Sequence, residues 1–246
     1  MRFPFRSAPA AALAWALPLC GHAAPPASTL YASLHAAAPD VQAAALQAAV
    51  DALACASAAG DLEARRLALI DYSLPSTQQR LWVFDLDGSK LLFRELVAHG
   101  RNSGDRDAQR FSNRDGSLQS SIGLFRTGGS YVGGKGYSLR LDGLEPGVND
   151  LALQRAIVIH GAPYVDAALA AKQGRIGRSW GCPAVRAGIA RPLIDAMKNG
   201  QLLFSYYPDP RWLASSRFLN CAARDARRDT LAQAGSATTM RALAAP

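Results

Sequence analysis

Residues 156–161 read AIVIHG, a short apolar run that ends in a histidine and a glycine. The run is too short for an ordinary helix and is rich in β-branched residues, which is typical of a buried strand. We therefore predict a buried strand over residues 156–160, with His160 at its end. The other segments can be placed by working outward from this strand.

Further short apolar runs precede and follow it. They are LALIDY from residue 67, RLWVFDL from residue 80, KLLFRELVAHG from residue 90, residues 122–126, residues 137–142 and residues 202–207. Asp87-Gly88 lies between two of these runs and predicts a hairpin turn. A stretch rich in Gly, Ser and Asn, residues 100–121, predicts a long surface loop. Short strands separated by turns therefore dominate the chain.

A few helices accompany the strands. Residues 40–57 have helical composition with Asp40 as a candidate N-cap, and a Pro/Ala/Ser linker precedes them. Residues 165–173 and 187–198 also predict helices. Hydrophobic residues make up 49% of the chain, which is enough for a core, and no internal repeat is visible. The prediction is a single α+β domain, mostly β.

The N-terminus has the pattern of a signal peptide over residues 1–24. Arg2 and Arg6 precede the apolar run AAALAWALPLC, and small residues follow near Ala23 and Ala24. No later segment is long and apolar enough to span a membrane. We expect an exported protein, periplasmic or associated with the cell wall. The basic residues that give the net charge of +8 are scattered along the chain and match no nucleic-acid motif, so no nucleic-acid partner is predicted.

A single cysteine stands out in GRSWGCPAVRAG, residues 177–188. Cys182 lies between Gly181 and Pro183, which disfavour the interior of a helix or strand. Its thiol has four possible fates: packing, a disulfide, a metal ligand or a nucleophile. No CxxC or HExxH spacing is present, so neither a metal site nor a thiol redox site is predicted.

A nucleophilic cysteine needs a base and donors for an oxyanion. His160 is the predicted base, and the N–H groups of Gly181 and Cys182 are candidate oxyanion donors, whereas Pro183 has no N–H. His99, in the similar context LVAHG, is the rival base, although we expect it to be a turn histidine near the cleft entrance. The glycine-rich GGSYVGGKG lacks the ending of a phosphate-binding loop, so it predicts a flexible lid.

These residues occur in an order that resembles a known family. The ordered motifs SIGLF from residue 121, VIHG from residue 158 and SWGC from residue 179 are similar to those of the YkuD-type murein L,D-transpeptidase catalytic-domain family. The resemblance covers about residues 67–212. It implies a catalytic domain of β-sandwich type after an N-terminal helix, with no cofactor and no metal, acting on peptidoglycan stem peptides.

The resemblance also implies roles for individual residues. Cys182 corresponds to the nucleophile, His160 to the base, and Gly161 to the residue whose carbonyl orients the imidazole. Ser179 and Gly181 correspond to residues that shape the nucleophile loop. The implied reaction is attack on a tetrapeptide stem, release of D-alanine and transfer of the acyl group to an amine, which forms a 3-3 cross-link.

The chain departs from the family at two places. Trp180 stands where many members have histidine, and Pro183-Ala184 replaces an apolar residue followed by arginine or asparagine. Trp180 is predicted to wall the cleft. The residues that bind substrate are therefore open, and the candidates are Tyr137, Arg140, Tyr164, Arg178, Arg186 and His99.

Four segments follow from these predictions: a signal peptide (1–24), a linker and N-terminal helix (25–66), the catalytic domain (67–212) and a partly disordered extension (213–246). Removal of the signal takes Cys20 with it and leaves three cysteines. Our hypothesis is that Cys55 pairs with Cys221 and leaves Cys182 free. The alternative is that Cys55 and Cys221 are reduced core residues.

Two other functions stay open at this point. With water as the acceptor, the same chemistry would give an L,D-carboxypeptidase. A non-catalytic peptidoglycan-binding protein could keep the fold and lose the reaction, but such a protein has no need of a Cys/His pair.

Overall fold

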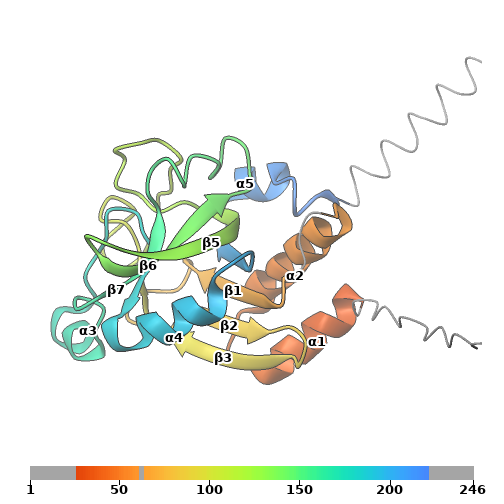
Figure 1. Ribbon diagram of the computed structural model, residues 1–246, viewed down its shortest axis with the longest axis horizontal. Coiled ribbons are helices and arrows are strands. Elements are labelled where there is room, and N and C mark those ends of the chain that lie inside the picture. The colour runs from red at the N-terminus through yellow and green to blue at the C-terminus, as the bar shows by residue number, and fades with distance from the viewer. Residues whose placement is uncertain (1–25, 61–63, 222–246) are drawn as a thin grey trace, which may run out of the picture.

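The computed structural model describes residues 26–60 and 64–221 (Figure 1). The predicted signal peptide and most of the predicted C-terminal extension lie outside the described residues. Within them, nine strands form one sheet in the order β3-β2-β1-β9-β5-β6-β7-β8-β4. The strands are β1 (Arg66–Asp71), β2 (Leu81–Asp85), β3 (Lys90–Glu95), β4 (Val97–Ala98), β5 (Gly123–Gly133), β6 (Gly136–Gly143), β7 (Val158–Ala162), β8 (Ala184–Arg186) and β9 (Leu202–Tyr206).

Five helices surround the sheet in the same part of the chain. They are α1 (Ala27–Ala37), α2 (Ala43–Ala58), α3 (Ala167–Gln173), α4 (Ala187–Met197) and α5 (Pro210–Ser215). The predicted α+β class, centred on a sheet with a helix at the N-terminus, is confirmed. None of the helices in the described ranges has the length and apolar character needed to cross a bilayer.

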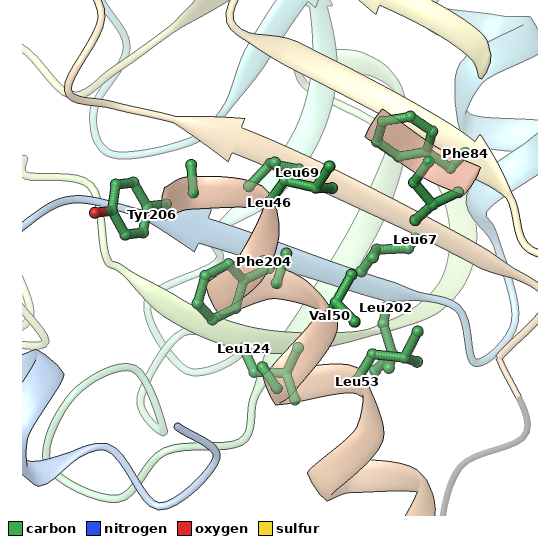
Figure 2. Close-up of a cluster of buried hydrophobic side chains, with 14 of the residues drawn as sticks. Leu46, Val50, Leu53, Leu67, Leu69, Phe84, Leu124, Leu202, Phe204 and Tyr206 are labelled. Carbon is green, nitrogen blue, oxygen red and sulfur yellow. The ribbon is translucent and has the colours of Figure 1, made fainter. Parts of the chain in front are cut away.

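The two faces of the sheet are covered by different helices. In β1, Leu67 and Leu69 belong to the core on the α2 side, whereas Ala68 and Ile70 belong to the core on the α4 side. This alternation is the period of two that a strand imposes. The buried residues of α2 recur at helical spacing and meet Leu67 and Leu69 in one cluster, with Leu46, Val50 and Leu53 among those drawn in Figure 2.

The start of α2 differs from the prediction. The helix begins at Ala43, after Gln42, and no side chain caps it. Asp40 instead accepts a hydrogen bond from Trp82 Nε1 (3.2 Å) and pairs with Arg94 Nε (3.0 Å). The Asp40 carboxylate is therefore bonded to β2 and β3, and the prediction that it caps the helix was wrong.

A second difference is α1, which occupies a segment predicted to be a linker. Alanine-rich sequence has a high intrinsic helix propensity. Leu34 is fully buried, and α1 packs against α2 and β3. Burial of this side adds the tertiary packing that a short helix needs in water.

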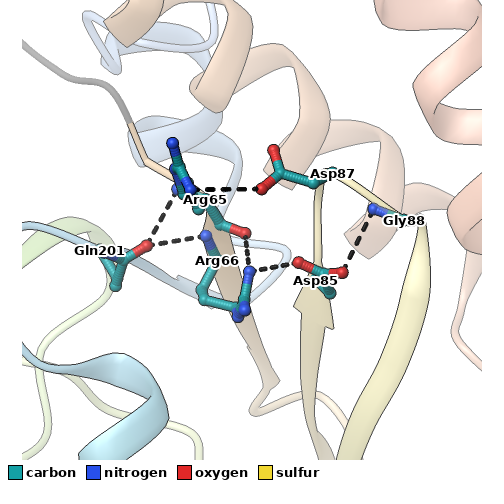
Figure 3. A network of polar contacts seen from close by, with 6 residues as sticks. All are labelled: Arg65, Arg66, Asp85, Asp87, Gly88 and Gln201. Carbon is teal, nitrogen blue, oxygen red and sulfur yellow. Dashed lines mark hydrogen bonds and ion pairs between the residues drawn. The ribbon is translucent and has the colours of Figure 1, made fainter.

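The beginnings of β1 and β9 and the end of β2 are held together by polar contacts (Figure 3). The side-chain oxygen of Gln201 accepts hydrogen bonds from the backbone N–H groups of Arg65 (2.9 Å) and Arg66 (2.8 Å). These bonds lie at the start of the parallel pairing of β1 with β9. Arg66 also pairs with Asp85 on β2. The Asp87-Gly88 turn after Asp85 joins antiparallel β2 and β3, which confirms the predicted hairpin.

The β5–β6 hairpin is longer than the strands predicted over residues 122–126 and 137–142. Pairing continues through most of the glycine-rich segment to Gly133 and Gly136, with a register shift between Thr127 and Ser130. Backbone hydrogen bonds alone can extend such a ladder, because most side chains there are small or exposed. The hairpin tip therefore lies at residues 133–136.

Candidate active site

Strand pairing brings His160 close to the segment that contains Cys182. His160 lies on β7, where it pairs with Ser138 of β6 on one side and Ala184 of β8 on the other. Cys182 comes two residues before Ala184. The parallel pairing of β7 with β8 therefore places the segment that contains Cys182 beside β7, although 22 positions separate His160 from Cys182 in the chain.

The imidazole of His160 is almost fully buried and its orientation is defined. Its exposed fraction is 3%, and its Nδ1 lies 3.0 Å from the carbonyl oxygen of Gly161. A carbonyl only accepts, so Nδ1 carries the proton and Nε2 has the free lone pair. Burial lowers the pKa of His160, and the charge of Lys135 lowers it further, while the Gly161 contact opposes both. The ring is therefore neutral and can accept a proton at neutral pH.

Gly161 permits close packing behind this histidine. A Cβ at Gly161 would lie 2.8 Å from Ala190 Cβ and 3.1 Å from Ala187 Cα, both on α4. Any side chain there would push β7 away from α4. The glycine therefore fixes the backbone whose carbonyl holds the ring.

Cys182 is the one free cysteine in the described part of the chain. Its Sγ lies 3.6 Å from the Ala156 carbonyl oxygen. Burial raises the pKa of the Cys182 thiol, while the Val158 N–H and the positive charges of Lys135 and Arg155 lower it. The net direction is upward, so the resting thiol is protonated and needs a base.

The turn before Cys182 is shaped by Ser179. Its Oγ accepts a hydrogen bond from the Gly181 N–H (3.1 Å) and donates one to the Cys182 carbonyl (2.6 Å). The Gly181 N–H is therefore already bonded, so only the Cys182 N–H remains of the two predicted oxyanion donors. Gly181 has a φ of +127°, a conformation that favours glycine.

A distant loop supports the back of this turn. A Cβ at Gly181 would lie 2.8 Å from the Gln119 carbonyl oxygen. Ser120 Oγ donates to the Gly181 carbonyl (3.0 Å) and accepts from the Gly100 N–H (3.0 Å). The stretch predicted as a surface loop thus includes residues buried against the nucleophile turn.

Arg155 holds that loop, and the sequence analysis missed it. Its guanidinium donates to four oxygens of residues 112–121: the carbonyls of Ser112 (2.5 Å) and Gln119 (2.7 Å), and the hydroxyls of Ser121 (2.6 Å) and Ser117 (3.1 Å). Burial lowers the pKa of Arg155, and the charge of Cys182 as a thiolate raises it. The only sequence signal was a basic residue just before the buried strand, which does not reveal these partners.

His99 does not lie near a cleft entrance, so that prediction was wrong. The side chain is fully buried, and its Nδ1 lies 2.7 Å from Nη2 of the equally buried Arg80. Burial, with the charge of Arg80, lowers the pKa of His99 to about 4. A buried ring beside a guanidinium cannot contact substrate, which removes His99 from the substrate-binding candidates. Its backbone carbonyl instead accepts a hydrogen bond from the Ser179 N–H (2.9 Å).

A disulfide joins Cys55 at the end of α2 to Cys221 after α5, with Cα atoms 5.9 Å apart. This separation lies within the usual range for disulfides. Two of the three cysteines outside the predicted signal are therefore bonded to one another, and both lie against the core on the α2 side.

A family profile described as "L,D-transpeptidase catalytic domain" matches residues 37–206. The match covers more than half of the chain and includes α2, the whole sheet and both His160 and Cys182. The chain belongs to the L,D-transpeptidase catalytic domain family.

Solved structures with some similarity include an L,D-transpeptidase from Mycobacterium smegmatis, which has 13% sequence identity and a TM-score of 0.38. The matched region covers 58% of this chain and 59% of that one. The helical cell shape determining protein Pgp2 of Campylobacter jejuni has 14% identity and a TM-score of 0.40, with 64% of this chain covering 55% of that one. An L,D-transpeptidase (Yku) from Stackebrandtia nassauensis has 12% identity and a TM-score of 0.36, with coverage of 75% and 92%.

This chain thus spans less than two thirds of the length of the first two of these proteins. No curated protein matches it. The assignment to the family rests on the profile match.

The three arginines predicted to bind substrate in this L,D-transpeptidase domain already have partners. Arg178 donates to the Gly104 carbonyl (3.0 Å) and pairs with Asp105 (3.2 Å). Arg186 pairs with Glu95 through both ends of its guanidinium. Arg140 stacks on the Tyr131 ring at 4.2 Å from its centroid.

The aromatic candidates of the domain divide into two groups. Tyr137 bonds to Asp195 on α4 (2.7 Å) and so contributes to packing. Burial, and after it the charge of Cys182 as a thiolate, raises the pKa of Tyr164 to about 12, so Tyr164 is electrostatically coupled to the thiol. Trp180 is 65% exposed next to Gly181, and Lys135 Nζ lies 5.1 Å from its ring centroid. Trp180 and Tyr164 are thus the predicted cleft residues that lie near Cys182.

Proposed function

We propose that this protein is an exported cysteine acyltransferase, an L,D-transpeptidase that acts on peptidoglycan stem peptides. The observation that carries the proposal is the neutral His160, held by Gly161, on the strand next to the one free cysteine of the described chain. The family match supports the choice of reaction. The disulfide between Cys55 and Cys221 supports an oxidising compartment.

In the proposed first half-reaction, His160 Nε2 takes the thiol proton as Sγ attacks the carbonyl carbon of the third stem residue. The Cys182 N–H donates to the oxyanion that forms. The C–N bond to the terminal D-alanine then breaks. The leaving nitrogen takes the proton from His160, which leaves a thioester on Cys182.

In the second half-reaction, an amine of a neighbouring stem attacks the thioester carbon. His160 takes a proton from this amine, and the Cys182 sulfur leaves and recovers its proton. The product is a 3-3 cross-link. If water replaces the amine, the product is a tripeptide, as in a carboxypeptidase.

The test incubates the protein lacking residues 1–24 with tetrapeptide-bearing muropeptides and identifies the products by mass. Cross-linked dimers support transpeptidation, and tripeptides alone support carboxypeptidation. The Cys182→Ala variant should lose all turnover and keep its unfolding midpoint. If the wild type turns over no muropeptide, or the variant turns over normally, the proposal is wrong.

A faster check uses a carbapenem and intact-protein mass spectrometry. Acylation of the thiol should add one carbapenem mass to the wild type and none to Cys182→Ala. Adduct formation at the same rate in both proteins would contradict the assignment of the nucleophile.

A further inference from the structure

The tip of the β5–β6 hairpin places a lysine beside the candidate nucleophile turn. Lys135 lies between the paired residues Gly133 and Gly136. Its ammonium lies over the exposed ring of Trp180, 5.1 Å from the centroid. An ammonium over an indole face is held by attraction to the ring quadrupole. The hairpin thus brings a cation to a residue only two positions before Cys182.

The charge of Lys135 acts on both candidate catalytic groups. It lowers the pKa of the Cys182 thiol, against the effect of burial. It also lowers the pKa of the His160 imidazole, in the same direction as burial. The thiol responds in the same way to one other cation, Arg155. Lys135 and Arg155 are thus the two cations whose charge favours the thiolate of Cys182.

These two cations differ in what they have left to bind. Arg155 donates to four oxygens of residues 112–121, two from Nη1 and two from Nη2, so both terminal nitrogens of its guanidinium are engaged. Within residues 26–60 and 64–221, Lys135 has no hydrogen-bond or ion-pair partner, and its ammonium lies over the Trp180 ring. Lysine has three N–H donors. All three remain available to a ligand beside Trp180.

The proposed reaction supplies an anion at this place. In a tetrapeptide donor, the carboxylate of the terminal D-alanine is three bonds beyond the carbonyl carbon that Cys182 attacks. A cation held over Trp180, two residues before Cys182, is therefore placed to meet that carboxylate. The arginines predicted for this role are bound elsewhere, as described above.

We propose that Lys135, held beside the nucleophile turn by Trp180, binds the terminal carboxylate of the donor peptide and determines specificity for donors that end in a free acid. This inference rests on the proposed function. It explains how a chain without the family's usual residues after the cysteine could select its donor: the cation comes from the hairpin and not from the segment after Cys182.

The test compares two tetrapeptide donors, one with a free terminal carboxylate and one with a terminal carboxamide. The release of D-alanine or D-alaninamide gives kcat/KM for each. We expect the wild type to prefer the acid by about 10- to 100-fold, the range of a hydrogen bond to a charged group. In Lys135→Gln this preference should fall to about 1, mainly through a higher KM for the acid.

The ratio of the two donors separates carboxylate binding from tuning of the thiol. Loss of the Lys135 charge also changes the pKa of Cys182, but that change affects both donors equally and cancels in the ratio. Lys135→Arg should retain most of the preference. Lys90→Gln, which removes a lysine from β3 at the far edge of the sheet, should leave the ratio unchanged.

A third donor, amidated on the side-chain carboxylate of its third residue, tests which anion is bound. Suppose that Lys135→Gln changes the preference between the free-acid donor and this third donor, but not the preference between terminal acid and terminal carboxamide. Then the terminal carboxylate is not the ligand and the proposal is wrong. The proposal is also overturned if the wild type turns over its donors but has the same acid-to-amide ratio of kcat/KM as Lys135→Gln. That result leaves the proposed function intact. No turnover of any donor overturns both.

Discussion

His160 Nδ1 lies 3.0 Å from the carbonyl oxygen of Gly161, the next residue in the chain. This contact fixes which nitrogen of the ring can act as a base, without help from a carboxylate. A carbonyl is neutral and stabilises an imidazolium less than a carboxylate does. The direction of the two pKa shifts fits this arrangement: both the thiol and the imidazole are kept neutral until substrate arrives.

The first prediction concerns the pH dependence of thiol reactivity. A raised pKa means that Cys182 keeps its proton to higher pH than the unperturbed value of 9.0. The rate of alkylation by iodoacetamide should therefore rise with pH and reach its plateau above pH 9. Below neutrality, His160 should remain a base to lower pH than its ordinary 6.5, because its pKa is lowered.

The matched variant is His160→Ala. At pH 7 its alkylation should be at least about tenfold slower than that of the wild type, in line with general-base effects. At high pH the two rates should converge, because hydroxide then removes the thiol proton. Equal rates at pH 7 would show that His160 does not act on Cys182.

A second prediction concerns Arg155, which ties the loop of residues 112–121 to the segment before β7. Arg155→Lys keeps the charge but cannot reach four oxygens at once. We expect it to lose about 2 kcal/mol of unfolding free energy, as for lost charged hydrogen bonds, and to lower kcat/KM by about tenfold. Urea unfolding and steady-state kinetics measure the two effects.

Arg155→Met separates the charge from the hydrogen bonds. It should raise the thiol pKa further than Arg155→Lys does, because the positive charge near Cys182 is gone as well. The alkylation pH profile reports this difference. Identical profiles for the two variants would mean that Arg155 acts only through the loop.

The contrast between Arg155 and His160 shows what the sequence could reveal. His160 ends an apolar run, and Cys182 sits in a turn marked by glycine and proline, so both signals are local. The partners of Arg155 lie in residues 112–121, a segment with no periodicity that could predict which of its oxygens turn inward. Contacts of that kind depend on the folded path of a loop and not on its composition.

His99 illustrates a false local signal. LVAHG and IVIHG look alike, and both place a histidine before a glycine after an apolar run. His99 is nevertheless buried against Arg80, whereas β7 carries His160 to the strand beside Cys182. The difference arises from which strands pair, and pairing between distant strands is not encoded in either run. The α1 helix was missed for a similar reason, since its stability depends on burial of Leu34.

The third prediction tests the geometry of the nucleophile turn. Gly181→Ala would place a Cβ 2.8 Å from the Gln119 carbonyl oxygen and 2.9 Å from Ile157 Cδ1, at a φ of +127°. Strain of this kind costs about 1–3 kcal/mol. We expect a lower urea midpoint and a large loss of carbapenem acylation. Gly188→Ala, in α4 with nothing within 4 Å, is the control and should be neutral or stabilising.

A fourth prediction concerns the disulfide. Thiol titration of the protein lacking residues 1–24, denatured without reductant, should find one reactive thiol. The double variant Cys55→Ser/Cys221→Ser should lose about 5 kcal/mol of unfolding free energy by the chain-entropy estimate for a loop of this length. Its carbapenem acylation should persist under native conditions, because Cys182 is not part of the bond. Three reactive thiols in the wild type would contradict the pairing.

The last prediction uses the buried His99 as a source of pH-dependent stability. Its pKa is lowered to about 4 in the folded protein, against an ordinary 6.5. Between these values the unfolded chain binds a proton that the folded protein does not, so stability falls as pH decreases through this window. The full effect is about 3 kcal/mol. Urea unfolding at pH 7 and pH 5 should show about half of this loss in the wild type, because pH 5 still lies above the folded pKa. In His99→Asn, which keeps an acceptor for Arg80 but does not titrate, the loss between pH 7 and pH 5 should be clearly smaller. An equal loss in both proteins would mean that other groups cause the acid sensitivity and that His99 is not protonated on unfolding in this range.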